Sequence, residues 1–215
     1  MKVFVVAMES EAECAVSNMA VAEETREFGF RVVRGTMRGE DVAVVVSGVG
    51  KAAAAAATLF ALGRFPGCGI VNFGLAGGLE PSMKVGDVYR IDRAVQYDFD
   101  LSGVIHKPVG TLDGRDGPYL PLSTAGGSRA FAFKTLGTGD RFNDSEADNT
   151  LLLGMGAGLR DMEGGAIAQI CELAGVPCRM YKCVSDVYGS GSMPEQFARN
   201  IEVCKARLKA ETPGF

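Results

Sequence analysis

Histidine is almost absent from this sequence, which has one, His106, among its 215 residues. Zinc sites with histidine ligands and Ser-His-Asp or Cys-His catalytic groups each need placed imidazoles. The scarcity of histidine nearly excludes both, and an exposed loop residue is the simplest interpretation of His106. Any chemistry must therefore depend on carboxylates, hydroxyls and backbone groups, and we expect neither a metal ion nor a cofactor.

Long apolar runs and basic stretches are also lacking. The longest apolar stretch, residues 52–63, is far shorter than the roughly 18 residues that a membrane span requires. The 22 Lys and Arg residues are outnumbered by 26 Asp and Glu residues, and no basic cluster would attract nucleic acid. We therefore expect no membrane and no nucleic-acid partner. The segment 1–8 is too short for a secretory signal and is followed at once by acids, so we expect a cytoplasmic protein.

Cysteine pairs of the CxxC type are absent, although the chain has six cysteines. Most of them lie in apolar segments, which indicates buried free thiols in a reducing compartment. The hydrophobic content of 47% and the charged content of 22% are typical of a globular protein. The length predicts one domain over residues 1–215.

Apolar runs alternate with helical segments along the chain. Strands are predicted at 3–7, 30–38, 40–47, 69–73, 86–95, 134–139 and 177–184. Helices are predicted at 9–19, 51–62, 160–174 and 194–210. The segment 102–127 is rich in Gly, Pro and Asp, which predicts loop with at most one short strand. Because the strands are continuously apolar, helices should cover both faces of the sheet, giving a three-layer α/β/α sandwich.

Two glycine-rich segments, GVGKAA (48–53) and GLAGGL (74–79), each follow a predicted strand. The first is similar to a dinucleotide-binding turn, but the next strand ends at Asn72 and lacks the acid that binds ribose. Close packing of an Ala-rich helix and contact with a ligand both remain open for it. Both segments lie at the carboxyl edge of the sheet, where open α/β sheets bind ligands.

Carboxylates also gather where strands end. Glu11 follows the first strand, Asp161 and Glu163 open a predicted helix, and Asp186 ends the strand YKCVSD. Each acid alone is typical of a helix cap or a dipole partner. Together they converge on one sheet edge in a chain without a catalytic histidine, which favours acid and base chemistry.

Seven segments carry a family resemblance, in the family's order and over nearly the whole chain. They are AMESEAE (7–13), SGVGKAAAA (47–55), NFGLAGGL (72–79), KVGDV (84–88), GTGDRF (137–142), DMEGGAIA (161–168) and SDV (185–187). The sequence resembles the nucleoside phosphorylase and nucleosidase superfamily, most closely the 5′-methylthioadenosine/S-adenosylhomocysteine nucleosidases. The resemblance implies a nucleoside phosphorylase-like sandwich with a central mixed sheet. It also implies a small-molecule nucleoside substrate and a place in methionine salvage and purine metabolism.

The implied reaction breaks the bond between adenine N9 and ribose C1′ through an oxocarbenium-like transition state, as in glycoside hydrolysis. In the family, Asp186 would protonate adenine N7, for which burial must let it hold a proton near neutral pH. Glu11 would orient the attacking water, and Glu163 would accept hydrogen bonds from the ribose hydroxyls.

The resemblance also implies a substrate-binding set. Its members within one subunit would be Met8, Ala76, Gly77, Phe142, Asn143, Asp161, Met162, Ser185 and Phe197. Met162 could equally be a core methionine, and Phe197 could belong to the apolar face of the last helix. Leu101 and Val104 would complete the pocket for the 5′ group of a partner subunit, which implies a homodimer.

Two residues depart from the phosphorylase pattern. Asn72 and Leu75 stand where phosphorylases carry an arginine and a Ser or Thr that hold phosphate, so we expect water to be the nucleophile. The alternatives are a purine nucleoside phosphorylase, a nucleosidase of the futalosine or AMP type, and a non-catalytic nucleotide-binding module. The sequence does not identify the preferred 5′ group.

Overall fold

A mixed β-sheet forms the centre of the protein. The computed structural model describes residues 1–128, 130–142 and 145–215, and within them the sheet has ten strands. These are β1 (Lys2–Val6), β2 (Ala20–Glu27), β3 (Phe30–Met37), β4 (Glu40–Val46), β5 (Gly69–Gly78), β6 (Val88–Gln96), β7 (Leu120–Pro121), β8 (Phe133–Thr138), β9 (Leu159–Asp161) and β10 (Cys178–Val187).

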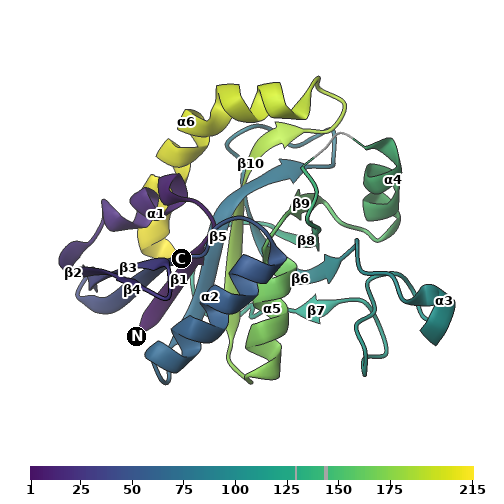
Figure 1. Ribbon diagram of the computed structural model, residues 1–215. Coiled ribbons are helices and arrows are strands. Elements are labelled where there is room, and N and C mark those ends of the chain that lie inside the picture. The colour runs from purple at the N-terminus through teal and green to yellow at the C-terminus, as the bar shows by residue number, and fades with distance from the viewer. Residues whose placement is uncertain (129, 143–144) are drawn as a thin grey trace.

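The sheet closes on itself at one end. Strand β5 pairs in parallel with β1 and β10, and antiparallel with β9. Strand β10 also pairs with β6, β6 with β8, and β8 with β9, so five strands form a ring. Strands β1, β4, β3 and β2 extend from β5 as an open wing (Figure 1), and the short strand β7 pairs with β6. The carboxyl ends of β5, β8, β9 and β10 lie together, because β10 pairs in parallel with β5 up to Gly78, β8 pairs in parallel with β9 up to Asp161, and the short strand β9 pairs with the end of β5.

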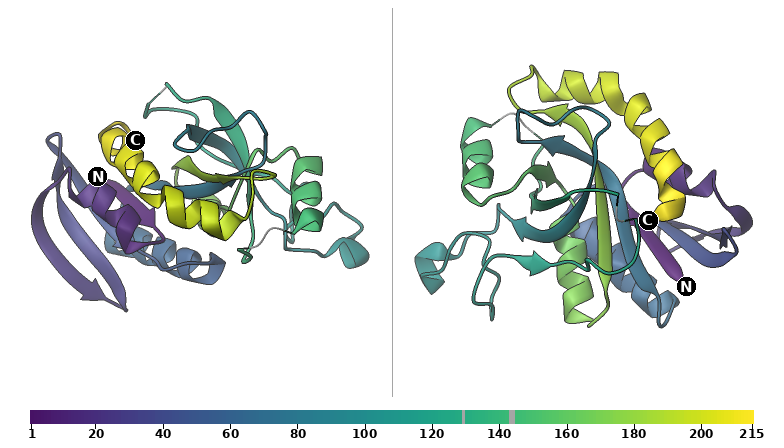
Figure 2. Two further views of the ribbon diagram at one scale, coloured as in Figure 1. Left: turned by 90° about the horizontal axis from the view of Figure 1, so that it is seen from above. Right: turned by 180° about the vertical axis from the view of Figure 1, so that it is seen from behind.

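Helices cover both faces of the sheet, as the sequence predicts. The helices are α1 (Glu9–Val16), α2 (Lys51–Arg64), α3 (Ser102–Ile105), α4 (Glu146–Gly154), α5 (Gly164–Leu173), α6 (Met193–Glu211) and the 3₁₀ turn η1 (Thr212–Gly214). α2 and α5 share one hydrophobic core, and α1 and α6 lie against the second core on the opposite face (Figure 2). The buried alanines Ala54, Ala57 and Ala61 let α2 approach the strands closely.

Several elements differ from those predicted from the sequence. The edge strand β2 was not predicted, because it is polar and almost wholly exposed and apolar patterning does not mark it. The helix α4 was not predicted either. The helix predicted at 160–174 begins only at Gly164, because Leu159–Asp161 pairs with β5 and β8. Finally, β5 continues through its glycines to Gly78, since both of its edges find partners there.

All six cysteines are free and buried, as predicted. The segment 102–127 is mostly loop with the short strand β7, as predicted, but its first residues form the short helix α3, which was not predicted. In the described part of the chain, no helix combines the length and the apolar character that crossing a membrane demands.

Candidate active site

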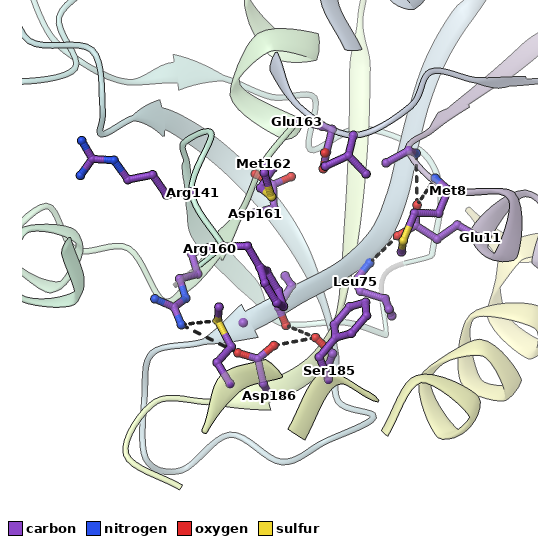
Figure 3. Close-up of a pocket in the computed structure, with 17 residues that line it drawn as sticks. Met8, Glu11, Leu75, Arg141, Arg160, Asp161, Met162, Glu163, Ser185 and Asp186 are labelled. Carbon is purple, nitrogen blue, oxygen red and sulfur yellow. Dashed lines mark hydrogen bonds and ion pairs between the residues drawn. The ribbon is translucent and has the colours of Figure 1, made fainter. Parts of the chain in front are cut away.

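A cavity of about 240 Å³ lies where β5, β9 and β10 end (Figure 3). The amino ends of α1, α5 and α6 face the same space, so side chains from distant parts of the sequence meet there. The cavity is lined by Ala7, Met8, Glu11, Val49, Leu75, Ala76, Gly77, Arg141, Phe142, Arg160, Asp161, Met162, Glu163, Ser185, Asp186, Met193 and Phe197.

Glu11 is buried at the start of α1 and is held by three backbone donors. Its Oε2 accepts hydrogen bonds from the amides of Ala7 at 3.1 Å and Met8 at 3.0 Å. Its Oε1 accepts one from Leu75 at 2.9 Å, on β5. Burial raises the pKa of Glu11, while the nearby ammonium of Lys182 and the backbone donors oppose that rise. The carboxylate is therefore fixed in one orientation facing the cavity.

Glu163, at the amino end of α5, is tied to the first glycine-rich segment. Its Oε1 accepts a 2.8 Å hydrogen bond from the amide of Gly50, whose φ of 100° favours glycine. Burial and the neighbouring carboxylate of Asp161 raise the pKa of Glu163 to about 7. The helix that follows the segment 48–53 packs closely on the sheet, as one interpretation expects, and the loop itself holds a cavity carboxylate; contact of this loop with a ligand stays a prediction.

Asp161 ends β9 and anchors the floor of the site. Its Oδ1 accepts a hydrogen bond from Thr138 at 2.6 Å, and its Oδ2 accepts one from the amide of Gly164 at 2.8 Å. The ammonium of Lys182, on β10, lies 2.9 Å from the same Oδ2. Burial opposes the charge of Lys182, but the carboxylates of Asp161, Glu163 and Glu11 outweigh it and raise its pKa.

Asp186 lies at the other end of the cavity from Glu11 (Figure 3). The pairing of β10 with β5 shifts register between Val184 and Asp186, so Ser185 is an extra residue in a bulge. A bulge lets adjacent side chains face one side, and both Ser185 and Asp186 line the cavity. The hydroxyl of Ser185 donates to Oδ2 of Asp186 at 2.7 Å.

Arg160, on β9, places a guanidinium beside Asp186. Its Nη2 lies 4.0 Å from Oδ1 of Asp186, and its side chain is 8% exposed. Nη1 donates to Oδ1 of Asn149 at 2.6 Å, and Nη2 donates to the sulfur of Met193. Gly77 leaves room for the pair, because a Cβ there would lie 2.8 Å from Oδ1 of Asp186 and 3.0 Å from Nε of Arg160.

Most of the predicted site residues meet in this cavity. Beside the three catalytic candidates, Met8, Ala76, Gly77, Phe142, Asp161, Met162, Ser185 and Phe197 line it. The rings of Phe142 and Phe197 contact each other edge to face, 5.5 Å apart. Asn143 lies outside the described residues. Leu101 and Val104 are not among the lining residues, and Val104, on α3, is 76% exposed. Their predicted role in a partner's pocket stays a prediction.

Arg160, Met193 and Lys182 are site residues that were not predicted from the sequence. Arg160 directly precedes the motif DMEGGAIA, but nothing in that spacing distinguishes an inward cation from a surface one. The position of Lys182 inside an apolar strand was a detectable signal for a buried ion pair, and the side chain is indeed only 2% exposed.

The cavity can perform acid and base chemistry on a small molecule with an aromatic part. Glu11 and Glu163 lie toward one end of the cavity and Asp186 toward the other (Figure 3), and aromatic and methionine side chains complete the lining. Among residues 1–128, 130–142 and 145–215, no group of three or more His, Cys, Asp or Glu side chains is arranged to hold a metal ion.

Comparison with known proteins places this site in a family context. The family model described as the phosphorylase superfamily matches residues 2–211. A 5′-methylthioadenosine/S-adenosylhomocysteine nucleosidase of Colwellia psychrerythraea is 30% identical over 213 residues, covering 91% of this chain and 87% of that protein.

Solved structures agree on the fold. A crystal structure of a Colwellia psychrerythraea nucleosidase of the same name, in complex with adenine, matches with a TM-score of 0.86 and 28% identity, over 100% of this chain and 96% of that one. A futalosine hydrolase of Helicobacter pylori matches with a TM-score of 0.86 at 21% identity, over 100% of this chain and 98% of that one. At 21% identity, that likeness concerns the fold alone.

Proposed function

The chain belongs to the phosphorylase superfamily and, within it, to the 5′-methylthioadenosine/S-adenosylhomocysteine nucleosidases, and we propose that it hydrolyses the N-glycosidic bond of 5′-modified adenosines. The substrate class comprises 5′-methylthioadenosine, S-adenosylhomocysteine and 5′-deoxyadenosine, and the products are adenine and the 5′-modified ribose. The observation that carries this proposal is the meeting of Glu11, Glu163 and Asp186 around one cavity.

The two ends of the cavity suit the two halves of a nucleoside. The base occupies the end with Asp186, where the carboxyl group gives a proton to N7 as the bond to C1′ breaks. The ribose occupies the end with Glu11 and Glu163. Glu163 accepts hydrogen bonds from the hydroxyls and stabilises the positive charge that grows on the sugar. Glu11 orients a water molecule and takes its proton as the water oxygen bonds to C1′.

Water is the nucleophile in this proposal because the carboxylate of Glu11 would repel a phosphate ion that approached C1′ from the same side. Glu11 occupies three backbone donors that an anion would otherwise use, the amides of Ala7, Met8 and Leu75. A Cβ on Gly74 would lie 2.5 Å from Oε1 of Glu11, so the carboxylate lies directly against β5. Asn72 is buried with its amide donating to the carbonyl of Val5 at 2.8 Å, and offers no cation.

A second subunit completes the pocket for the 5′ group. Met8, Phe142 and Phe197 line the cavity of a single chain, while α3, which follows Leu101 and contains Val104, extends away from the sheet (Figure 1). In a homodimer, the exposed apolar side chain of Val104 would cover the partner's 5′ group. This enzyme would act in methionine salvage and purine metabolism in the cytoplasm.

The test is a substrate panel with product analysis. Each 5′-modified adenosine is incubated with the protein with and without phosphate, and adenine and the sugar product are separated and quantified. We expect adenine and free methylthioribose at the same rate in both buffers. Methylthioribose 1-phosphate would instead identify a phosphorylase, and no cleavage of any adenosine would contradict the proposed substrate class. Glu11→Gln, which keeps the shape of the side chain, is the matched inactive control.

A further inference from the structure

We propose that Arg160 makes the base subsite accept 6-oxopurines, so that the enzyme also cleaves inosine-type nucleosides with hypoxanthine as the leaving base. This inference rests on the proposed function, since it concerns the base end of the same cavity. It extends the substrate class beyond adenosines.

The position of the guanidinium is the first argument. Arg160 lines the cavity beside Asp186, the residue that faces the base in the proposed function. Its hydrogen bond to Asn149 and its contact with Met193 fix the plane of the guanidinium, and Figure 3 shows Arg160 extending toward Asp186. The other arginine that lines the cavity, Arg141, differs: its side chain is 54% exposed and it pairs with Asp148 at 2.9 Å.

Hydrogen-bond complementarity is the second argument. At the edge that contains N7, adenine offers one acceptor, N7, and one donor, the 6-amino group. A protonated carboxyl such as Asp186 can serve both by itself. A 6-oxopurine offers two acceptors at the same edge, N7 and O6, and arginine is the side chain that pairs with them most often. Because a guanidinium has only donors, Arg160 adds nothing for the 6-amino group and can donate to O6.

The charge of Arg160 is the third argument. The guanidinium of Arg160 is a buried cation 4.0 Å from Asp186, at the end of the cavity that holds the base in the proposed function. For a 6-oxopurine, the negative charge that develops as N9 departs spreads onto O6, and the guanidinium stabilises it directly.

The reaction balances with water alone. The C1′–N9 bond breaks and its electron pair goes to the base, where the charge resides on O6 next to Arg160. The water oxygen bonds to C1′, and Glu11 takes the proton that it releases. The base then takes one proton from solvent at a ring nitrogen and Glu11 returns its proton to solvent, so that hypoxanthine and the 5′-modified ribose leave.

The test compares 5′-methylthioinosine with 5′-methylthioadenosine in the native protein and in Arg160→Met. We expect the native protein to cleave both, and the ratio of kcat/KM for the inosine to that for the adenosine to fall about 10- to 100-fold in Arg160→Met. Arg141→Met, the matched control, should leave that ratio unchanged. Cleavage of the adenosine alone by the native protein, or a ratio changed less than threefold by Arg160→Met, would overturn the inference and leave the proposed function intact.

Binding of the free bases tests the role of Arg160 separately from the proposed function. Titration calorimetry of the native protein with hypoxanthine and with adenine needs no variant and no turnover. We expect hypoxanthine to bind with a Kd within tenfold of that for adenine. If hypoxanthine does not bind where adenine does, the inference is wrong. If neither nucleoside is cleaved but hypoxanthine binds and Arg160→Met weakens it, the proposed function fails while the assignment of Arg160 stands.

Discussion

The ammonium of Lys182 lies 2.9 Å from Oδ2 of Asp161 inside the protein, with side chains only 2% and 1% exposed. Such a buried pair is costly to desolvate, and removal of one partner leaves an uncompensated charge. The pair joins β10 to β9 directly beneath the cavity. The charge of Lys182 also acts on Glu11 and Glu163, whose pKa values it lowers. It therefore counters the effect of burial on the two carboxylates at the ribose end.

Lys182→Met should shift the pH profile of activity. Loss of the positive charge raises the pKa of Glu11 and Glu163 further, so the acidic limb of kcat/KM should move to higher pH. The free energy of unfolding should fall by about 3–5 kcal/mol. The measurements are kcat/KM from pH 5 to 9 and urea unfolding. Lys182→Arg keeps the charge, so its acidic limb should lie close to that of the native protein. Lys205→Met, on the surface, should change neither the pH profile nor the free energy of unfolding. If the acidic limb of kcat/KM lies at the same pH in Lys182→Met as in the native protein, this electrostatic role is disproved.

Glu163→Gln should change how stability depends on pH. Burial and Asp161 raise the pKa of Glu163 from 4.5 to about 7, so between these values the unfolded chain loses a proton that the folded protein retains. The stability that this carboxyl contributes is complete below about pH 4.5 and is lost as pH rises through about 7. The glutamine variant should match the native protein at pH 4 and exceed it at pH 8 by about 3 kcal/mol. Equal urea midpoints at pH 8 would contradict the raised pKa.

Asp186→Asn should nearly abolish adenine release and keep the fold. The amide can still accept the hydrogen bond from Ser185, but it has no acidic proton to give, and loss of a general acid costs about 10²- to 10⁴-fold in kcat. Adenine release and thermal unfolding are measured on the same samples. Asp116→Asn, at a fully exposed carboxylate, is the control. Turnover near the native rate in Asp186→Asn would eliminate it as the proton donor to N7.

Gly74→Ala should damage the site more than the fold. Its Cβ would lie 2.5 Å from Oε1 of Glu11, so the carboxylate that orients water must move. We expect kcat to fall about 100-fold, because a small misplacement of a catalytic group can slow the reaction by that factor. Gly63→Ala, in α2 with open space around its Cβ, is the matched control and should be stabilised by about 0.5–1 kcal/mol at native activity. Equal kinetics for the two variants would argue against placement of water by Glu11.

The homodimer is tested at Val104. A glutamate there should weaken association, because it puts a charge at the apolar surface that would meet the partner. Light scattering should show dimers for the native protein and monomers for Val104→Glu, with a raised KM. Phe28→Glu, at the equally exposed β2–β3 turn, should stay dimeric. A native monomer with full activity would refute the proposed partner pocket.

The sequence by itself determined the layered α/β fold and most of the cavity. Continuous apolar strands require helices on both faces, and motifs such as DMEGGAIA fix which carboxylates lie at strand ends. Glu11, Glu163 and Asp186 are therefore predictable from the sequence, because each follows a strand within its own segment and the family resemblance implies its role.

The tertiary structure alone decided the contacts between segments. Pairing of β5 with β10 closes the ring of strands, and a bulge turns Ser185 and Asp186 to the same side. The hydrogen bond from Gly50 to Glu163 spans 113 residues, and the pairs of Lys182 with Asp161 and Arg160 with Asp186 depend on which strands become neighbours. Local patterning can mark a lysine in an apolar strand as buried, but it does not identify the partner of a charged side chain, because the neighbouring strands are settled only when the sheet closes.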